Sequence, residues 1–254
     1  MKKLALGLAV IWPAIGLAQD NGQTNQRWID SEDFQFSVGL GVVGLSGVYD
    51  GQDDELLPFP LLTATYGALT VDITKGLEVR LWENDTTRLS AGVVYNGAPD
   101  LPDTDLFDDL DRDDWVGGSL SATHDFGMFD VALSGQVDIS DQHDGGDAEL
   151  SVGRSFVMGR TLFEGRLGAT YLDANQGNYL YGVATDEAND LRAAYDVKES
   201  WTPHVDLAVF YAVTDTTSVG GFFRHEEFPD EIAESPLLDT SERTTIGLTL
   251  VRTF

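Results

Sequence analysis

The chain contains no cysteine and few basic residues. With no Cys among 254 residues, disulfide bonds, thiolate metal sites and cysteine nucleophiles are all excluded. Only 15 Lys and Arg stand against 43 Asp and Glu, which gives a formal net charge of -28. Such an acidic surface repels the phosphates of nucleic acids, so we expect no nucleic-acid partner.

Long apolar runs are also scarce. The stretch from Leu4 to Leu17 contains Pro13 and is shorter than the ~20 residues that a membrane-spanning helix needs. Lys2 and Lys3 precede it, and the small-x-small pattern Gly16-Leu17-Ala18 follows it. This pattern is typical of an export signal. We therefore expect a signal peptide over residues 1–18 and a periplasmic extension over residues 19–33, followed by one domain over residues 34–254.

The sequence offers little for catalysis or metal binding. Its 4 histidines are far apart in the sequence and are not spaced as metal ligands. No G-x-S-x-G motif occurs, and Ser121, His124 and Asp125 would alternate between the faces of a strand. We expect no enzymatic activity, no cofactor and no metal site.

What the chain does have is alternation of apolar and polar residues with a period of two. Around residue 133, for example, Val131 and Leu133 would face one way and Ala132 and Ser134 the other. Repeated segments of about ten such residues are typical of a transmembrane barrel. We predict strands over residues 34–48, 56–66, 68–74, 76–83, 87–96, 115–126, 128–139, 147–157, 160–171, 201–213, 216–228 and 243–254.

The connections between these segments separate a barrel from a soluble sandwich. Tight turns alternate with longer, acidic loops, of which residues 97–114 and 172–200 are the longest. An outer-membrane barrel has short periplasmic turns and long outer loops, whereas a sandwich has no reason to sort its loops. The pattern predicts an all-β fold: a transmembrane antiparallel β-barrel of about 12 strands in outer-membrane lipid of a Gram-negative bacterium, with periplasmic termini.

The last ten residues, TIGLTLVRTF, resemble the insertion signal of such barrels. They form a two-periodic strand that stops on Phe. We assign the assembly signal to its apolar face, and we expect the barrel-assembly machinery to recognise these residues: Ile246, Leu248, Leu250 and Phe254.

Both signs of charge occur at positions that would face the lumen, and Glu149 is one of these positions. Inside a narrow barrel such groups pair across strands and close the lumen, and we favour this interpretation. A cation-selecting constriction is the alternative. The predicted lumen polar network comprises Asp72, Glu78, Arg80, Arg88, Asp130, Asp138, Glu164, Arg166, Asp206 and Arg224.

Two of the long loops suggest further features. Residues 100–114 carry eight aspartates, a composition that could bind calcium, but they lack the spacing of an EF-hand, so we favour a solvated acidic loop. In the loop over residues 172–200, Thr185 to Asn189 are compatible with a helix start that has acidic residues in the first turn. Such a helix would lie over the mouth of the barrel or fold into it, and an ordinary capped surface loop is the equal alternative.

Four stretches together resemble the MipA/OmpV family of outer-membrane proteins. They are GLGVVGLSGVYDGQDDELLPFP (39–60), NYLYGVATDEAN (178–189), the region from Tyr195 to Tyr211, and DEIAESPLL (230–238) followed by the closing strand. The resemblance extends from about Phe34 to Phe254.

This resemblance implies a monomeric barrel that serves as an envelope scaffold. The resemblance implies this role through the family's name-giving member, which looks like a scaffold that brings a lytic transglycosylase together with a murein synthase of the peptidoglycan machinery. A small cation-preferring pore or transporter and a surface adhesin are the alternatives.

Overall fold

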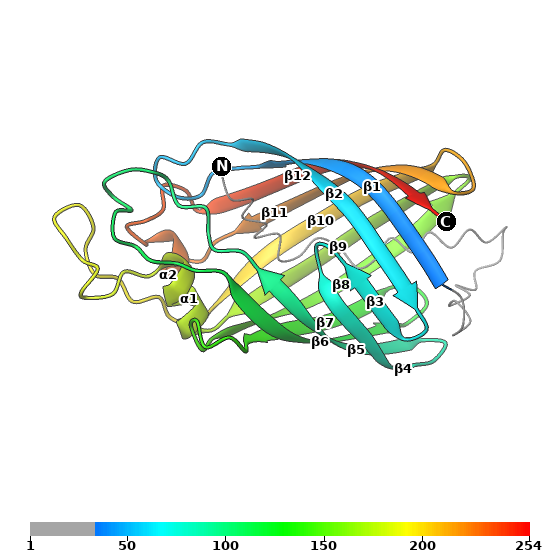
Figure 1. Ribbon diagram of the computed structural model, residues 1–254, viewed down its shortest axis with the longest axis horizontal. Helices are drawn as coiled ribbons and strands as arrows, with labels where there is room; N and C mark the ends of the chain where they lie inside the picture. Colours follow the sequence, from blue (N-terminus) through cyan, green and yellow to red (C-terminus); the bar gives the residue numbers. More distant parts are fainter. Residues whose placement is uncertain (1–33) are drawn as a thin grey trace.

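Twelve strands and two short helices make up the protein, and the computed structural model describes residues 34–254 (Figure 1). The predicted signal peptide and periplasmic extension lie outside these residues. The strands are β1 (Phe34–Leu45), β2 (Glu55–Tyr66), β3 (Leu69–Asp72), β4 (Gly76–Glu83), β5 (Thr87–Asn96), β6 (Trp115–Asp125), β7 (Asp130–Asp138), β8 (Gly146–Met158), β9 (Thr161–Leu172), β10 (Ser200–Ala212), β11 (Thr217–Glu227) and β12 (Glu242–Thr253). The helices are α1 (Ala174–Tyr181) and α2 (Asp230–Ala233).

The strands form a closed antiparallel barrel in which each strand pairs with its neighbours in the sequence. β12 returns to β1, with Ser37 opposite Thr253 and Leu45 opposite Thr245, and this pairing closes the sheet. Because β12 pairs with β1, neither strand has a free edge at this seam. Backbone polar groups in hydrocarbon need such hydrogen-bond partners. The prediction of a closed barrel of twelve strands is confirmed, and every strand lies within three residues of its predicted span.

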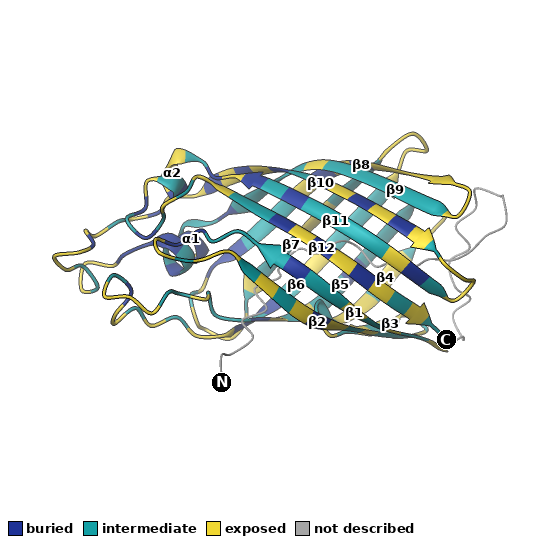
Figure 2. Ribbon diagram, turned by 90° about the horizontal axis from the view of Figure 1, so that it is seen from above, coloured by how far each residue is buried: buried dark blue, intermediate teal, exposed yellow. Residues whose placement is uncertain are grey.

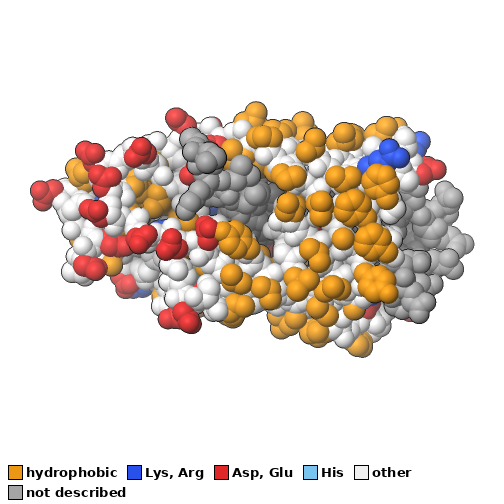
Figure 3. Space-filling model, viewed as in Figure 1, with side chains coloured by type: hydrophobic (Ala, Val, Ile, Leu, Met, Phe, Trp, Pro, Cys, Tyr) orange, Lys and Arg blue, Asp and Glu red, His pale blue; other side chains and the backbone are white. Residues whose placement is uncertain are grey.

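The outer surface of the barrel carries a broad apolar band. Residues alternate between exposed and more buried along each strand (Figure 2), and orange side chains cover the barrel wall in Figure 3. On β7, for example, Leu133 and Val137 are 53% and 58% exposed. In a membrane barrel this face contacts lipid and the opposite face lines the lumen. No helix in residues 34–254 has the length and apolar character to span a membrane.

The two ends of the barrel differ. One end, the turn end, has tight connections such as residues 67–68 and 159–160, and both Phe34 and Phe254 lie there (Figure 1). The other end, the loop end, carries the long connections, where acidic side chains gather (Figure 3). This sorting of connections is the one expected for an outer-membrane barrel.

The long loops at the loop end pack against one another around an apolar core. The core joins residues 46–54, 97–114, 173–199 and 228–241, which we call the loop cap. Tyr49 meets Phe107 edge-on at 5.7 Å between ring centroids, and Tyr181 packs against Phe228 at 5.8 Å. The acidic loops are therefore solvated on the outside only, because their apolar side chains form a core of their own.

The helix alternative at Thr185 is wrong. The helix in this loop is α1, which begins earlier because the Asp173 carboxylate caps it and accepts from the Gln176 amide at 2.8 Å. The Glu187 carboxylate accepts from the Ala184 amide at 2.8 Å and binds Arg112, but the chain does not continue as a helix beyond this turn. The segment from Thr185 forms a turn instead.

The β3–β4 hairpin is much shorter than its neighbours. β3 has 4 residues, whereas β2 has 12. Figure 1 shows this hairpin ending partway along the barrel, well before the outer end of β2. Its tip is fixed by Asp72, whose carboxylate accepts from the Thr74 and Lys75 amides at 2.8 and 3.1 Å.

Candidate functional site: charged side chains across the lumen

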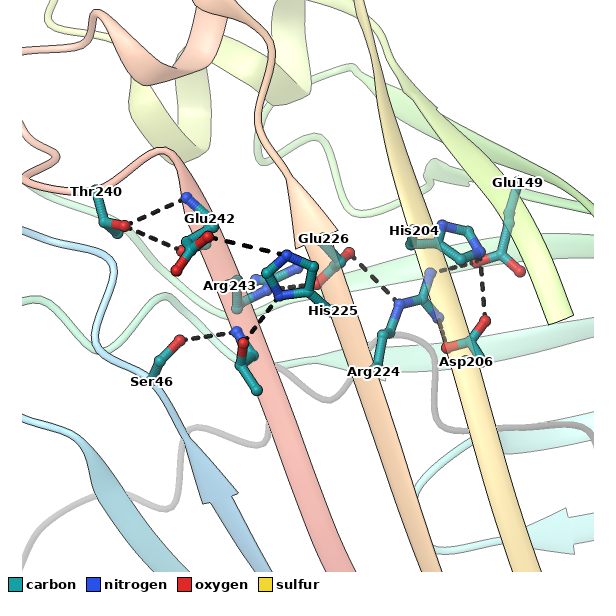
Figure 4. Close-up of polar contacts among 11 residues, drawn as sticks. Ser46, Glu149, His204, Asp206, Arg224, His225, Glu226, Thr240, Glu242 and Arg243 are labelled. Carbon is teal, nitrogen blue, oxygen red and sulfur yellow. Dashed lines mark hydrogen bonds and ion pairs between the residues drawn. The ribbon is translucent and has the colours of Figure 1, made fainter. Parts of the chain in front are cut away.

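The largest cluster of charged side chains in the described barrel lies inside the lumen toward the loop end (Figure 4). Strand register places its members side by side. Asp206 of β10 is opposite Arg224 of β11, and Glu226 of β11 is opposite Arg243 of β12. We call this group the lumen network, and its members are Glu149, His204, Asp206, Arg224, Glu226 and Arg243.

Arg224 is the centre of the lumen network. Its guanidinium lies 2.8 Å from a Glu149 oxygen, 3.6 Å from Asp206 and 3.5 Å from Glu226. Glu226 in turn accepts from Arg243 Nε at 2.7 Å. These contacts join β8, β10, β11 and β12 through one chain of charges.

The charged side chains of the lumen network are buried, so their stability depends on how their charges are paired. Asp206 is 3% exposed and Glu226 is 6% exposed. Removing charged groups from water is costly unless each finds an opposite charge and hydrogen bonds. Three carboxylates here face two guanidiniums, with His204 beside them at 3.4 Å from Asp206 and 3.7 Å from Glu149.

The predicted lumen residues divide into separate groups. Asp206 and Arg224 belong to the lumen network. Asp130 and Arg166 form a second ion pair, in direct contact, on β7 and β9. Gly153 of β8 lies between them and leaves room for the Arg166 side chain, because a Cβ at position 153 would fall 2.7 Å from it.

A third group lies toward the turn end. Arg80 and Arg88 both bind Glu83, at 2.9 and 3.1 Å. Arg80 also donates to the Gly67 carbonyl at 3.0 Å, which ties the β4 strand to the turn after β2. This group was predicted in part, because Glu83 was not among the candidates.

The other predicted members order local turns or lie outside the lumen network. Asp72 caps the β3–β4 turn, as described above. Asp138 accepts from the amides of Ser140, Gln142 and His143 at 2.6 to 2.7 Å, so it orders its own loop and does not bridge the lumen. Glu78 lies on β4 opposite Gly92, and Glu164 lies on β9 opposite Ala208, both outside the lumen network.

Sequence reasoning missed Glu226, Arg243 and the position of His204 in the network. Glu226 and Arg243 occupy the outer ends of their strands, where alternation gives way to loop composition. Glu226 lies two residues after Arg224, and Arg243 lies two residues before Thr245, so alternation along each strand places them on the same faces as those residues. This was the signal in the sequence that could have identified them. Which residue they face depends on register between strands, which alternation along one strand does not report.

The structure also separates the residues that a hydrolase would need to bring together. Ser121 and His124 lie on opposite faces of β6, with Leu120, on the His124 face, 55% exposed on the outer wall. His124 bonds instead to Thr87 at 2.6 Å. Within residues 34–254 no group of three or more His, Cys, Asp or Glu side chains is arranged to hold a metal ion.

The four residues of the predicted assembly signal share one face of the closing strand. Ile246, Leu248, Leu250 and Phe254 are 51% to 64% exposed on the outer surface. Their backbones join β12 to β1 and β11. Recognition by the assembly machinery remains a prediction.

Comparison with known proteins identifies relatives that include named outer-membrane proteins. The chain is 27% identical over 251 residues to MltA-interacting protein of Escherichia coli (strain K12), a match that covers 95% of this chain and 94% of that protein. Putative outer membrane protein YiaT of the same strain is 26% identical over 223 residues, covering 83% and 87%. Outer membrane protein OmpV of Vibrio cholerae serotype O1 is 23% identical over 274 residues, covering 100% of both chains.

These relatives and the apolar band agree on location: the protein is an outer-membrane β-barrel of a Gram-negative type. The sequence profile of one family matches residues 38–254, from β1 to the end of the chain. The chain belongs to that family, described as MltA-interacting protein MipA.

Proposed function

We propose that this barrel is an envelope scaffold that holds a lytic transglycosylase, and with it a murein synthase, at the periplasmic face of the outer membrane. The observation that carries the proposal is the lumen network, in which Arg224 and Arg243 join carboxylates from three other positions. A polar core with paired charges suits a rigid anchor better than an open conduit. The partner class follows from the relative named MltA-interacting protein.

The turn end offers a surface for such a partner. In the proposed orientation this end faces the periplasm. The β8–β9 hairpin presents Val157 and Met158, which are 70% and 66% exposed, and the neighbouring turn presents Met128, also 70% exposed. Exposed apolar side chains next to polar ones are typical of interaction sites. The turns are short, so we place the contact on these hairpin tips.

Co-purification from gently solubilised envelopes tests the scaffold. A tagged wild-type barrel should retain a lytic transglycosylase, and Met158→Glu should lower the amount retained. Leu191→Glu is the matched control, because Leu191 is 60% exposed but lies in the loop cap at the opposite end. Absence of the transglycosylase from complexes of folded wild-type protein would contradict the proposal.

A small cation-preferring pore is the second candidate, favoured by the acidic side chains that gather at the loop end (Figure 3). Such a charge raises the local concentration of cations. Planar-bilayer recording separates the two functions. Stepwise, cation-selective conductance by the wild-type protein would support a pore, and a silent bilayer containing folded protein would support the scaffold.

A further inference from the structure

The short β3–β4 hairpin leaves the barrel wall unpaired on one side. β3 pairs with β2 only over Thr63–Tyr66, and β4 pairs with β5 only as far as Val93. On the side of this gap, residues 56–61 of β2 and 94–96 of β5 have no ladder partner in the described chain, whereas on their other sides β2 pairs with β1 and β5 pairs with β6. We call the region between these two segments, above the hairpin tip, the side opening (Figure 1).

The sequence of β2 is adapted to this free edge. The Ile73 amide donates to the Leu62 carbonyl at 3.0 Å, so the backbone groups of Leu62 point toward the β3 side. Backbone direction alternates along a strand, and Pro58 and Pro60 therefore point the same way as Leu62. Proline has no amide hydrogen, so this edge lacks two of the donors that a pairing strand would need.

The side opening faces hydrocarbon. Strand register places Pro60 in one row with Leu40 of β1 and Leu250 of β12. Leu40 and Leu250 are 69% and 51% exposed on the outer wall, and Leu56, next to the prolines, is 72% exposed. The rim of the opening on β2 is thus at the level of the apolar band that contacts lipid.

The lumen behind the opening is apolar too. The Phe59 ring on β2 lies across Gly41 of β1, so close that a Cβ at position 41 would fall 2.3 Å from it. Phe222 of β11 lies across Gly247 of β12 in the same way: a Cβ at position 247 would fall 2.2 Å from the Phe222 ring. Register places Phe59 and Phe210 in one row, and Leu57 and Phe222 in the adjacent row, across the five strands from β2 through β1, β12 and β11 to β10. We call this the phenylalanine patch, and its members are Leu57, Phe59, Leu61, Phe210 and Phe222.

The patch retains surface that a ligand could cover. Leu57, Leu61 and Phe222 are only half-buried. The lumen network lies immediately beyond the patch on the loop side, because Arg224 follows Phe222 two residues further along β11. An apolar ligand entering from the side would therefore meet a nonpolar floor and a charged wall.

We propose that the side opening admits one acyl chain of a membrane lipid, which lies against the phenylalanine patch. A hydrocarbon chain needs no hydrogen bonds from the β2 edge, whereas an added strand from a second copy would need the donors that Pro58 and Pro60 lack. A polar solute would have to cross an apolar rim. The headgroup stays at the membrane surface.

Photolabelling of the wild-type protein tests this site. The protein is reconstituted in phosphatidylcholine vesicles that contain a phospholipid with a diazirine at the end of one acyl chain, then irradiated, digested and analysed by mass spectrometry. Adducts are expected on outer residues such as Leu133, which is 53% exposed, and also on the half-buried Leu57 and Leu61 inside the lumen. Ser134 is the control, because it faces the lumen behind the fully paired β6–β7–β8 wall and should stay unlabelled.

A variant measures the contribution of the patch. Phe59→Asn should reduce the adducts on Leu61 several-fold, while labelling of Leu133 in the same sample stays constant and heat-modifiable gel mobility confirms folding. Three results would overturn the proposal: labelling of lumen residues on β2 no higher than that of Ser134, unchanged labelling of Leu61 in the variant, or lumen labelling by a water-soluble diazirine but not by the lipid. Crosslinks between two protein chains at the β2 edge would favour strand pairing and also contradict it.

Discussion

At the scale of single residues, Arg224 holds the most charge contacts in the lumen, with Glu149, Asp206 and Glu226 around it. Arg224→Gln removes the cation and leaves buried carboxylates without their partner. Breaking a buried pair in this way costs about 3–5 kcal/mol. We expect a clearly lower unfolding temperature in detergent, followed by heat-modifiable gel mobility.

The control for Arg224 is an arginine outside the lumen. Arg252 lies exposed on β12 with its guanidinium 5.0 Å from the Phe254 ring, so Arg252→Gln should change stability little. Equal unfolding temperatures for the two variants would show that the lumen network contributes no stability.

Glycine positions under the phenylalanine rings give a second residue-scale prediction. A Cβ at Gly220 would fall 2.2 Å from the Phe210 ring, whereas a Cβ at Gly165 meets nothing nearer than Leu207 at 3.7 Å. Gly220→Ala should therefore destabilise the barrel by about 1–3 kcal/mol through overpacking. Gly165→Ala should fold like the wild type, and loss of stability in both variants alike would contradict the assigned packing.

Arg154 shows what alternation along a strand can and cannot predict about a side chain. It lies on the outward face of β8 together with Leu150 and Val152, yet it is charged. β8 pairs with β9 in continuous register through Arg154, whereas its pairing with β7 ends at Gly153, and Arg154 lies exposed near the turn end of the strand. The outward direction follows from alternation along the strand, whereas its height on the barrel depends on the stagger between strands.

At the scale of elements, helix α1 depends on a single capping side chain. The Asp173 carboxylate accepts from the Gln176 amide at 2.8 Å and from the Gly146 amide at 2.7 Å. Asp173→Ala should cost about 1 kcal/mol and expose the loop over residues 173–199 to protease. Limited proteolysis measures this, with Asp190→Ala, at an exposed position of the same loop, as the control; equal cleavage rates would refute the role of the cap.

The elements themselves were largely predictable, and their contacts were not. All twelve strands could be located because alternation is a local property of the sequence. The short hairpin around Gly76 could also be located, because the predicted spans 68–74 and 76–83 are shorter than their neighbours. Its consequence, that residues 56–61 of β2 lack a ladder partner on the β3 side, depends on comparing the lengths of β2, β3 and β5 in register. The loop cap was missed for a related reason, since its core joins four loops far apart in the chain.

At the scale of the whole molecule, acid should loosen the loop cap before the barrel. Hydrogen bonds from Arg112 lower the pKa of Glu187 in the loop cap. Burial lowers the pKa of His143, which lies in the neighbouring β7–β8 loop and stacks on Tyr179 of the loop cap at 4.8 Å between ring centroids. The stability from Glu187 is complete above its unfolded pKa of ~4.3 and is lost as the pH falls through the lower folded pKa. Protonation of His143 favours the opened loops as the pH falls below ~6.5.

Both groups therefore act in the same direction. We expect loop cleavage by an acid-tolerant protease to increase as the pH falls from 7 to about 4, while heat-modifiable mobility still reports a folded barrel. Each sample is compared with a heat-unfolded one to correct for protease activity. Faster cleavage at neutral pH than at acid pH would contradict this assignment.

The apolar band makes the whole fold dependent on an amphiphile. Side chains such as Leu40 and Leu248 are 69% and 62% exposed on the outer wall of the barrel. Removal of detergent should precipitate the purified protein, whereas transfer into lipid nanodiscs should keep it folded. A soluble, folded protein free of amphiphile would rule out the membrane barrel.

The loop cap has a consequence for antibodies raised against the protein. Its surface is assembled from residues 46–54, 97–114, 173–199 and 228–241, which are held together by Tyr49, Phe107, Ile232 and their neighbours. Any epitope that spans two of these segments exists only in the assembled shape. Antisera raised against linear peptides from single segments should therefore recognise the denatured chain on a blot and bind intact cells poorly.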